Sequence, residues 1–179
     1  GLVRLHFHAR GAISNLFLEP QATLPPTSGD YVRLCVYAVG LNFRDVLNVL
    51  GEYPGDPGPP GGDTAGIVGD LPFPLHSVFG LGYAPLACVT IAAAPFLIDK
   101  PAAYSFEQAS TLPVTWSTTH AAVERAGLRA GRVIIVQAAA GGVGLKAVEY
   151  AWWMRCAPMG TAGRPHKHAQ LQGAGVAAT

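Results

Sequence analysis

The spacing of hydrophobic positions changes a little past the middle of the chain. Up to about residue 100, short apolar runs alternate with turns rich in Gly and Pro, such as "PPTSGD" and "PGDPGPPGG". The runs are "VRLHFHAR", "YVRLCVYAV", "AGIVG", "HSVFGLG" and "PLACVTIA". This pattern predicts a compact, twisted β domain of barrel type. One helix is predicted within it, over "NFRDVLNVLG", where an apolar face recurs at helical spacing and Gly51 ends the helix. That face consists of Phe43, Val46, Leu47 and Leu50.

From about residue 105 the pattern becomes that of alternating helices and strands. Ser105 and Gln108 have the spacing of a capping box, and a second helix, "TTHAAVERAG", ends at Gly127. "GRVIIVQ" is typical of a strand buried on both faces of a parallel sheet. The helix "GGVGLKAVEYAWWM" and a second strand in "CAPMGTAG" follow, although Pro158 weakens that strand. We therefore expect a mixed fold of two parts: a β domain over residues 1–104, then connecting helices and the first βαβ unit of a nucleotide-binding α/β domain over 105–179.

A glycine-rich turn joins the apolar strand to the helix that follows it. Its six residues fit the phosphate-binding pattern G-x-G-x-x-G with alanine in the first, tight-turn position. They are Ala139, Ala140, Gly141, Gly142, Val143 and Gly144. In such a turn Gly141 lets the backbone approach a pyrophosphate, and Gly144 lets the helix pack closely on the strand. The helix N-terminus offers N–H groups to the phosphates. The alternative is a purely structural turn.

The segment after the second strand indicates which nucleotide the turn would bind. Sites that prefer NAD usually carry Asp or Glu about 20 residues after the turn, where it binds the ribose 2′-hydroxyl. Residues 163–168 contain no acid, and their cationic or titratable side chains are Arg164, His166, Lys167 and His168. Because cationic groups suit a 2′-phosphate, the sequence favours NADPH over NADH. The alternative is an exposed basic loop that binds nothing.

Composition narrows the classes of protein. Half of the 179 residues are hydrophobic and 13% are charged, which suits a packed core. The net charge of +1 argues against a nucleic-acid or membrane partner, and no apolar run is long enough to span a bilayer. Cys35, Cys88 and Cys156 are too far apart for a disulfide framework, so we expect three buried thiols in a cytoplasmic protein. The pairs His6/His8 and His166/His168 supply too few ligands for a metal site.

Five segments resemble, in order, the enoyl reductase domain of type I polyketide synthases. They are "RGAISNLFLEP", "VGLNFRDVLNVLGEYPGDPGPPGGDTAGIV", "SVFGL", "FEQASTLPVTWSTTHAAVERAGLRAG" and "AAAGGVG". That family belongs to the zinc-independent branch of the medium-chain dehydrogenases/reductases, beside the quinone oxidoreductases. The resemblance implies a GroES-like twisted β-barrel joined to a Rossmann domain. Zinc is not expected, because Gly61-Gly62-Asp63 stands where zinc-dependent relatives have Gly-His-Glu.

The resemblance also implies an activity and partners. The family uses NADPH to reduce a trans-2-enoyl thioester on an acyl carrier protein, with hydride going to the β-carbon and a proton to the α-carbon. Partners would then be the acyl carrier protein, neighbouring polyketide synthase domains and, over an open sheet edge, a second copy of the chain.

Four residues match functional positions of the family. Asn42 matches an asparagine close to the nicotinamide, and Thr118 a threonine on the cofactor side of the cleft. Tyr53 matches a tyrosine implicated in protonating the α-carbon; alternatively, it stacks at a Pro-Gly turn. Lys167 matches a lysine proposed as a proton donor; alternatively, it binds the 2′-phosphate or faces water. Arg44 and Asp45, one residue apart, are interpreted as salt-bridge partners of the scaffold.

The chain also departs from the family pattern. Only "DLPFPLH" connects "GIVG" to "SVFGL", and the chain ends before the remaining Rossmann strands of complete members. Gly1 in place of Met, together with this early end, predicts a C-terminally truncated piece whose strand 133–136 has an unpaired edge. Two other functions remain open at this point: a stand-alone quinone oxidoreductase, and a non-catalytic remnant with an interaction role.

Overall fold

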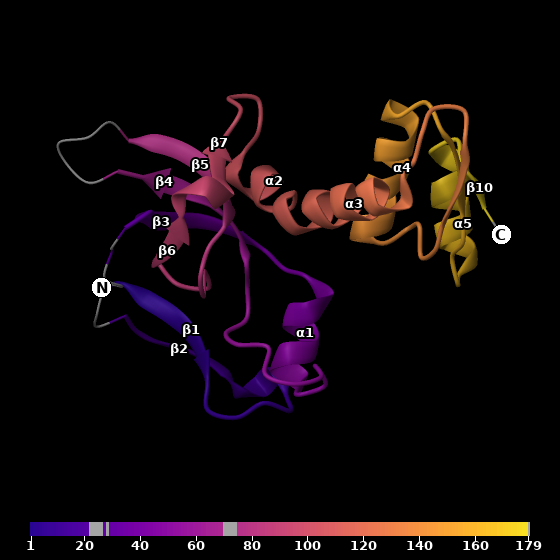
Figure 1. Ribbon diagram of the computed structural model, residues 1–179. Helices are drawn as coiled ribbons and strands as arrows, with labels where there is room; N and C mark the ends of the chain where they lie inside the picture. The colour runs from indigo at the N-terminus through magenta and orange to yellow at the C-terminus, as the bar shows by residue number, and fades with distance from the viewer. Residues whose placement is uncertain (22–26, 28, 70–74, 179) are drawn as a thin grey trace. The chain divides into compact units, whose positions relative to one another are not determined.

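A computed structural model describes residues 1–21, 27, 29–69 and 75–178 (Figure 1). The chain divides into two compact units, residues 1–114 and 115–179, so the division falls ten residues after the expected boundary at 104/105. Half of the predicted "PPTSGD" turn and most of the "DLPFPLH" connection lie outside the described residues.

An antiparallel five-stranded sheet forms the centre of the first unit (Figure 1). Its strands are β3 (Tyr31–Gly40), β4 (Asp63–Val68), β5 (His76–Leu81), β6 (Val89–Ala93) and β7 (Leu97–Asp99). They lie in the order β6-β3-β4-β5-β7. Helix α2 (Phe106–Ser110) covers this sheet and buries Ala109 against Ala65 and Phe79. The expected β domain is confirmed by this sheet.

The arrangement is consistent with the expected GroES-like domain, although its strands do not form a closed barrel within the described residues. A separate antiparallel hairpin, β1 (Val3–Phe7) with β2 (Leu16–Pro20), lies beside the sheet. Backbone hydrogen bonds connect the two: Leu5 N–H donates to Leu86 O, and Cys88 N–H donates to Val3 O.

Helix α1 (Phe43–Leu50) begins and ends as the sequence predicts, with Gly51 at a φ of 75°. Its buried face, however, carries two polar residues beside Val49: Asp45 and Asn48 are 5% and 0% exposed. Asp45 accepts hydrogen bonds from Asn42 N–H and Gly61 N–H, both at 2.8 Å, and Asn48 Nδ2 donates to Gly58 O. These side chains hold the glycine- and proline-rich loop, and the apolar Phe43 on the other face is 74% exposed.

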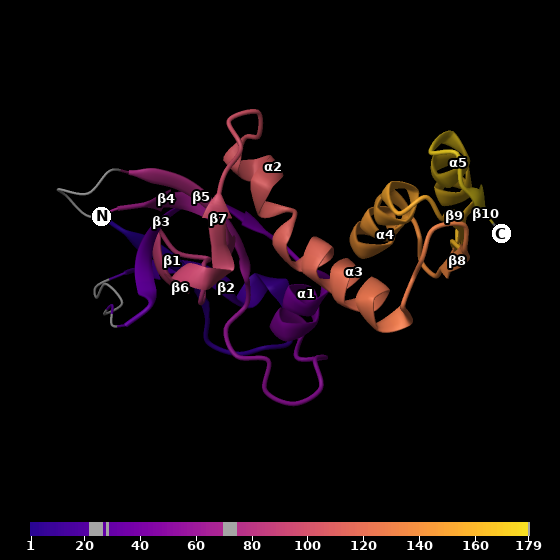
Figure 2. The same cartoon turned by 45° about the horizontal axis from the view of Figure 1, so that its top comes forward.

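The second unit contains a parallel sheet of three strands, in the order β10-β9-β8 (Figure 2). The strands are β8 (Val133–Val136), β9 (Ala157–Gly160) and β10 (Ala177–Ala178). Its helices are α3 (Pro113–Ala126), which begins two residues before this unit, α4 (Gly142–Trp153) and α5 (Pro165–Gly173). Helix α4 packs on β8 and β9, and α5 packs on β10. Val148 and Leu171 lie in the resulting core. This is the predicted βαβ unit, extended by a second helix and strand.

Pro158 does not break the second strand, because of the direction in which its backbone nitrogen points. Ala157 N–H donates to Arg132 O and Thr161 N–H to Val136 O, so alternate residues of β9 bond to β8. The nitrogen of Pro158 therefore faces the opposite side, where pairing with β10 begins only at Met159. The strand loses no ladder bond to the proline.

One face of this sheet lacks a covering layer in the described structure. Val133, Ile135 and Met159 are 63%, 67% and 41% exposed. In the strand order of the described residues, β8 lies at the edge of the sheet, as the sequence predicts. The exposure of Val133 and Ile135 corrects the expectation that this strand is buried on both faces.

Candidate functional site

The glycine-rich turn connects β8 to the N-terminus of α4, as the phosphate-binding pattern requires. The first hydrogen bond of α4 runs from Leu145 N–H to Gly141 O. The N–H groups of residues 142–144 therefore lie at the start of the helix, where α-helices have no internal acceptor for them. Gly141, Gly142 and Val143 are exposed. An anion can reach this end of the helix, where the helix dipole favours negative charge.

Two small residues of the turn serve packing. A Cβ on Gly144 would lie 2.5 Å from Ala138 O and 2.6 Å from Ala139 Cα, so only glycine lets α4 approach the turn this closely. Ala139 is fully buried, and a Cβ on Gly160 of the neighbouring strand would lie 2.9 Å from its methyl group. The sharp backbone reversal occurs one residue earlier than expected, at Ala138, whose φ is +49°.

The basic segment lies next to this turn, and Thr161 connects them. Ala139 N–H donates to Thr161 O, and Ala138 N–H donates to Thr161 Oγ1. Since β8 and β9 are parallel and paired, their carboxyl ends share one edge of the sheet. Arg164 is the N-cap residue of α5, and Lys167 lies in its first turn. Thr161 was not singled out from the sequence, because its role depends on the register of β9.

In the first unit, Asn42 is held by two carboxylates. Asn42 and Asp45 form a capping box at the start of α1, in which Asn42 N–H donates to Asp45 Oδ2 at 2.8 Å. The amide Nδ2 of Asn42 donates to Asp63 Oδ2 at 3.0 Å. Asp63 Oδ1 also accepts a hydrogen bond of 2.8 Å from Val114 N–H, in the first turn of α3. Asp63 was not predicted as a site residue, although a carboxylate in the apolar run "GGDTAGIV" was a usable signal.

Asp63 is a buried acid, only 1% exposed. Burial raises the pKa of its carboxyl from 3.8 to about 6, and the negative charge of Asp45 acts in the same direction. The hydrogen bonds from Asn42 and Val114 lower the pKa, but they do not cancel the effect of burial. Folding therefore raises the pH at which this carboxyl loses its proton, although the group is still mostly ionised at neutral pH.

This raised pKa predicts that the chain becomes less stable as the pH rises. A group whose pKa is higher in the folded state contributes its full stabilisation when the pH is below the pKa of the unfolded state. This stabilisation is lost as the pH rises through the pKa of the folded state. The free energy of unfolding, measured relative to an Asp63→Asn variant, should fall by about 3 kcal/mol between about pH 3 and pH 7. Urea unfolding followed by far-UV circular dichroism at a series of pH values measures it. A difference that stays constant or grows with pH would contradict the assignment.

Tyr53 lies half-buried near the loop after α1, where Arg44 contacts its ring. The Arg44 guanidinium carbon is 5.7 Å from the ring centroid, within cation–π range, and Arg44 Nη2 donates to Pro57 O. No ion pair joins Arg44 to Asp45 among the described residues, which corrects the expectation of a salt bridge. The two side chains act separately: Asp45 supports Asn42, and Arg44 stacks on Tyr53.

The predicted site residues divide between the two units. Asn42 and Tyr53 belong to the first, and the turn, Arg164 and Lys167 belong to the second. Thr118 is an exposed residue of α3 in the second unit, while its neighbour Thr119 is buried and donates to Thr115 O. Each unit thus presents its own group of candidate residues.

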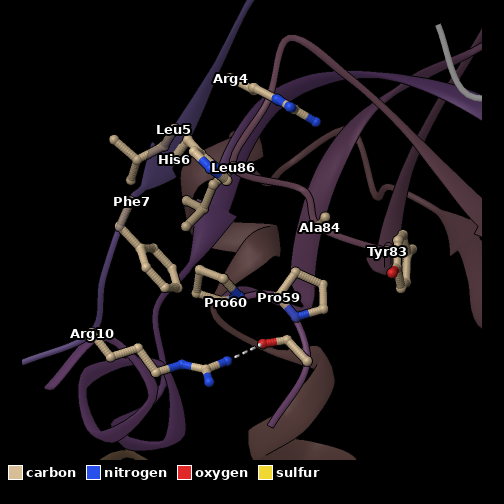
Figure 3. A pocket seen from close by; sticks show the side chains of 11 residues that line it. Arg4, Leu5, His6, Phe7, Arg10, Pro59, Pro60, Tyr83, Ala84 and Leu86 are labelled. Carbon is tan, nitrogen blue, oxygen red and sulfur yellow. Dashed lines mark hydrogen bonds between the residues drawn. The ribbon is translucent and has the colours of Figure 1, made fainter. Parts of the chain in front are cut away.

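Two cavities of the first unit have a lining that includes none of these predicted site residues. A cavity of about 380 Å³ lies among β1, the 58–60 loop and residues 83–86, with Arg10 donating to Gly58 O at its edge (Figure 3). An apolar cavity of about 240 Å³ shares Leu5, Pro60 and Leu86 with it. Arg4, at the first cavity, is already paired with Glu19 at 2.6 Å. We place no candidate site in either.

Several other expectations concern metals, thiols and membranes. Over the described residues, no three His, Cys, Asp or Glu side chains gather in a way that could hold a metal ion. Cys156 is buried, but Cys35 is exposed and Cys88 partly so, which corrects the expectation of three buried thiols. In the same part of the chain, every helix is too short or too polar to cross a membrane.

Comparisons with known proteins agree with this architecture. No protein-family model matches the chain. Over 150 residues it is 42% identical to the spectinabilin polyketide synthase system protein NorB of Streptomyces orinoci, covering 79% of this chain and 7% of that protein. The solved structure of the CurK enoyl reductase matches with a TM-score of 0.87 and 31% identity. The quinone oxidoreductase of Thermus thermophilus, solved also in complex with NADPH, matches with 0.81 and 32%. Both matches cover 99% of this chain and 59% of the other.

The fold, the glycine turn and these matches relate the chain to the enoyl reductases and quinone oxidoreductases of the medium-chain dehydrogenase/reductase superfamily. Its sequence relatives are type I polyketide synthases. The chain spans only part of each relative, 7% of the NorB protein and 59% of the two solved chains.

Proposed function

We propose that this chain is part of an NADPH-dependent enoyl reductase that reduces a trans-2-enoyl thioester carried on an acyl carrier protein. The observation that carries the proposal is the edge of the second unit where the glycine turn and the cationic start of α5 meet through Thr161. The 42% identity to a polyketide synthase supports an acyl thioester as the substrate.

The residues of this edge fit NADPH. The N–H groups at the start of α4 suit the pyrophosphate, and Gly141 leaves room for it. Arg164 and Lys167 suit the 2′-phosphate, because the segment after β9 offers cations and no carboxylate to a ribose hydroxyl. When bound, NADPH supplies hydride for the β-carbon of the enoyl group.

The first unit would contribute the groups that act on the substrate. Asn42, fixed by two carboxylates, would orient the nicotinamide through its amide. Tyr53 would donate the proton to the α-carbon, and the guanidinium of Arg44 over its ring would hold it in place. Lys167 is a second candidate donor, since an ammonium group near the cofactor can also release a proton. Thr118 would contact the cofactor from α3.

A quinone oxidoreductase is the second candidate, because the Thermus thermophilus enzyme is as similar to the chain as the CurK reductase. The two functions differ in substrate. Incubating the chain with NADPH and either crotonyl-pantetheine or a benzoquinone, with NADPH oxidation followed by its near-UV absorbance, separates them. Oxidation with the thioester alone is the expected result. Oxidation with the quinone alone would favour the second candidate, and absence of NADPH binding would leave only a non-catalytic role.

A further inference from the structure

We infer that Asp63 is a positioning residue that sets the orientation of the Asn42 side-chain amide and thereby determines which group Asn42 presents to a ligand. The inference deepens the proposed function and rests on it, since the ligand in question is the nicotinamide of NADPH. Its structural basis is the geometry around Asp63, at the start of β4.

The site around Asp63 is built to hold a carboxylate in one place. Gly40 lies opposite Asp63 in the β3–β4 pairing, and a Cβ on Gly40 would lie 2.8 Å from Asp63 Cβ and 2.1 Å from Ser110 O. Only glycine leaves room there. Both carboxylate oxygens are used, Oδ1 by Val114 N–H and Oδ2 by Asn42 Nδ2. Asp63 thus connects the start of α1 to the start of α3.

The charge of Asp63 determines which end of the Asn42 amide it can face. An ionised carboxylate accepts hydrogen bonds and donates none, so it selects the amide nitrogen of Asn42. The amide oxygen is then the end left to accept hydrogen bonds from the start of α1 and from a ligand. The carboxamide N–H₂ of a nicotinamide is a donor of the required kind. If the Asn42 amide were turned the other way, its N–H₂ group would face the N–H₂ group of the nicotinamide, and two donors form no hydrogen bond.

An asparagine in place of Asp63 would reverse this selection, at the cost of the hydrogen bond that the Asn42 oxygen accepts at the start of α1. The oxygen of the new side chain could still accept from Val114 N–H, but its amide nitrogen would then face Asn42. Asn42 would turn its oxygen inward, which restores the hydrogen bond and presents N–H₂ to the ligand instead. Protonation of Asp63 has a similar effect, because a carboxylic acid can donate to the Asn42 oxygen. The charged group facing Asp63 among the described residues is Asp45, which already accepts from Asn42 N–H and Gly61 N–H.

A double-mutant cycle on cofactor binding tests the inference. At pH 7.5, Asp63→Asn should weaken NADPH binding at least about tenfold while its far-UV circular dichroism spectrum shows that the chain stays folded. Asn42→Ala should weaken it to a similar extent. If Asp63 acts only through Asn42, the double variant binds no more weakly than Asn42→Ala alone. Binding by Asp63→Asn at the wild-type level, or a further loss in the double variant, would overturn the inference.

A second measurement needs no cofactor, so it separates a failure of this inference from a failure of the proposed function. In isotope-labelled protein, the NMR signals of the Asn42 side-chain amide, identified by their loss in Asn42→Ala, should shift with pH with a midpoint at about 6. The shift should disappear in Asp63→Asn. Asn15, whose Nδ2 donates to Ala9 O at 3.0 Å, is the control that should not follow this transition. An Asn42 signal that does not respond to Asp63 would overturn the inference even if NADPH binds.

Discussion

Replacing Gly144 by alanine should destabilise the second unit by about 3 kcal/mol, enough to unfold a marginally stable domain. The added Cβ would lie 2.5 Å from Ala138 O and 2.6 Å from Ala139 Cα, and both are backbone atoms that cannot turn aside. The gain from placing alanine instead of glycine in a helix is only about 1 kcal/mol, so the clash dominates. Urea unfolding followed by tryptophan fluorescence measures the effect, because all three tryptophans, Trp116, Trp152 and Trp153, lie in this unit.

Gly142→Ala is the matched control, two residues earlier on the same helix. A Cβ there would meet Thr115 Cγ2 at 3.5 Å, an ordinary van der Waals contact, and Gly142 is exposed. Its unfolding curve should stay within about 1 kcal/mol of the wild type. If both variants unfold alike, the close approach of α4 to the turn is not what requires glycine at position 144.

Replacing Gly141 by valine should abolish NADPH binding while the second unit stays folded. The backbone of Gly141 is extended, with φ −86° and ψ 170°, a conformation that suits valine, and its Cβ would meet Ala138 O at 3.3 Å. The side chain would stand at the exposed start of α4, where we place the pyrophosphate. We expect at least about 100-fold weaker binding, or about 3 kcal/mol, in a fluorescence titration with NADPH.

Gly173→Val is the control for this second prediction. Gly173 lies at the end of α5, in open space, away from the turn. The variant should bind NADPH as the wild type does, and tryptophan fluorescence should show that both variants are folded. Binding that persists in Gly141→Val would mean that the pyrophosphate does not lie against this turn.

Local signals in the sequence predicted most elements of this fold. The apolar repeat and Gly51 indicated the limits of α1, and the capping box of Ser105 and Gln108 indicated the start of α2. These signals are short-range: they depend on residues three or four apart in one segment. The strand–turn–helix context of the glycine turn is also local, and its position next to the basic segment follows from two parallel strands.

The features that the sequence did not reveal depend on contacts between distant segments. Asp63 acquires its role from Asn42, 21 residues earlier, and from Val114, 51 residues later. Thr161 supports the turn 23 residues before it. The buried face of α1 was equally hidden, because its polar residues are buried only where they bind the 58–61 loop. Nothing in the spacing of Asp45 and Asn48 distinguishes them from surface residues.

We propose that the second unit binds NADPH through the turn and the cations at the start of α5. Titrating the chain with NADPH and, in parallel, with NADH, while following nucleotide fluorescence, tests it most directly. We predict saturable binding of NADPH that is at least about tenfold tighter than that of NADH, because only NADPH has the 2′-phosphate that we assign to Arg164 and Lys167. Failure of NADPH to bind, or equal affinity for the two nucleotides, would contradict the claim.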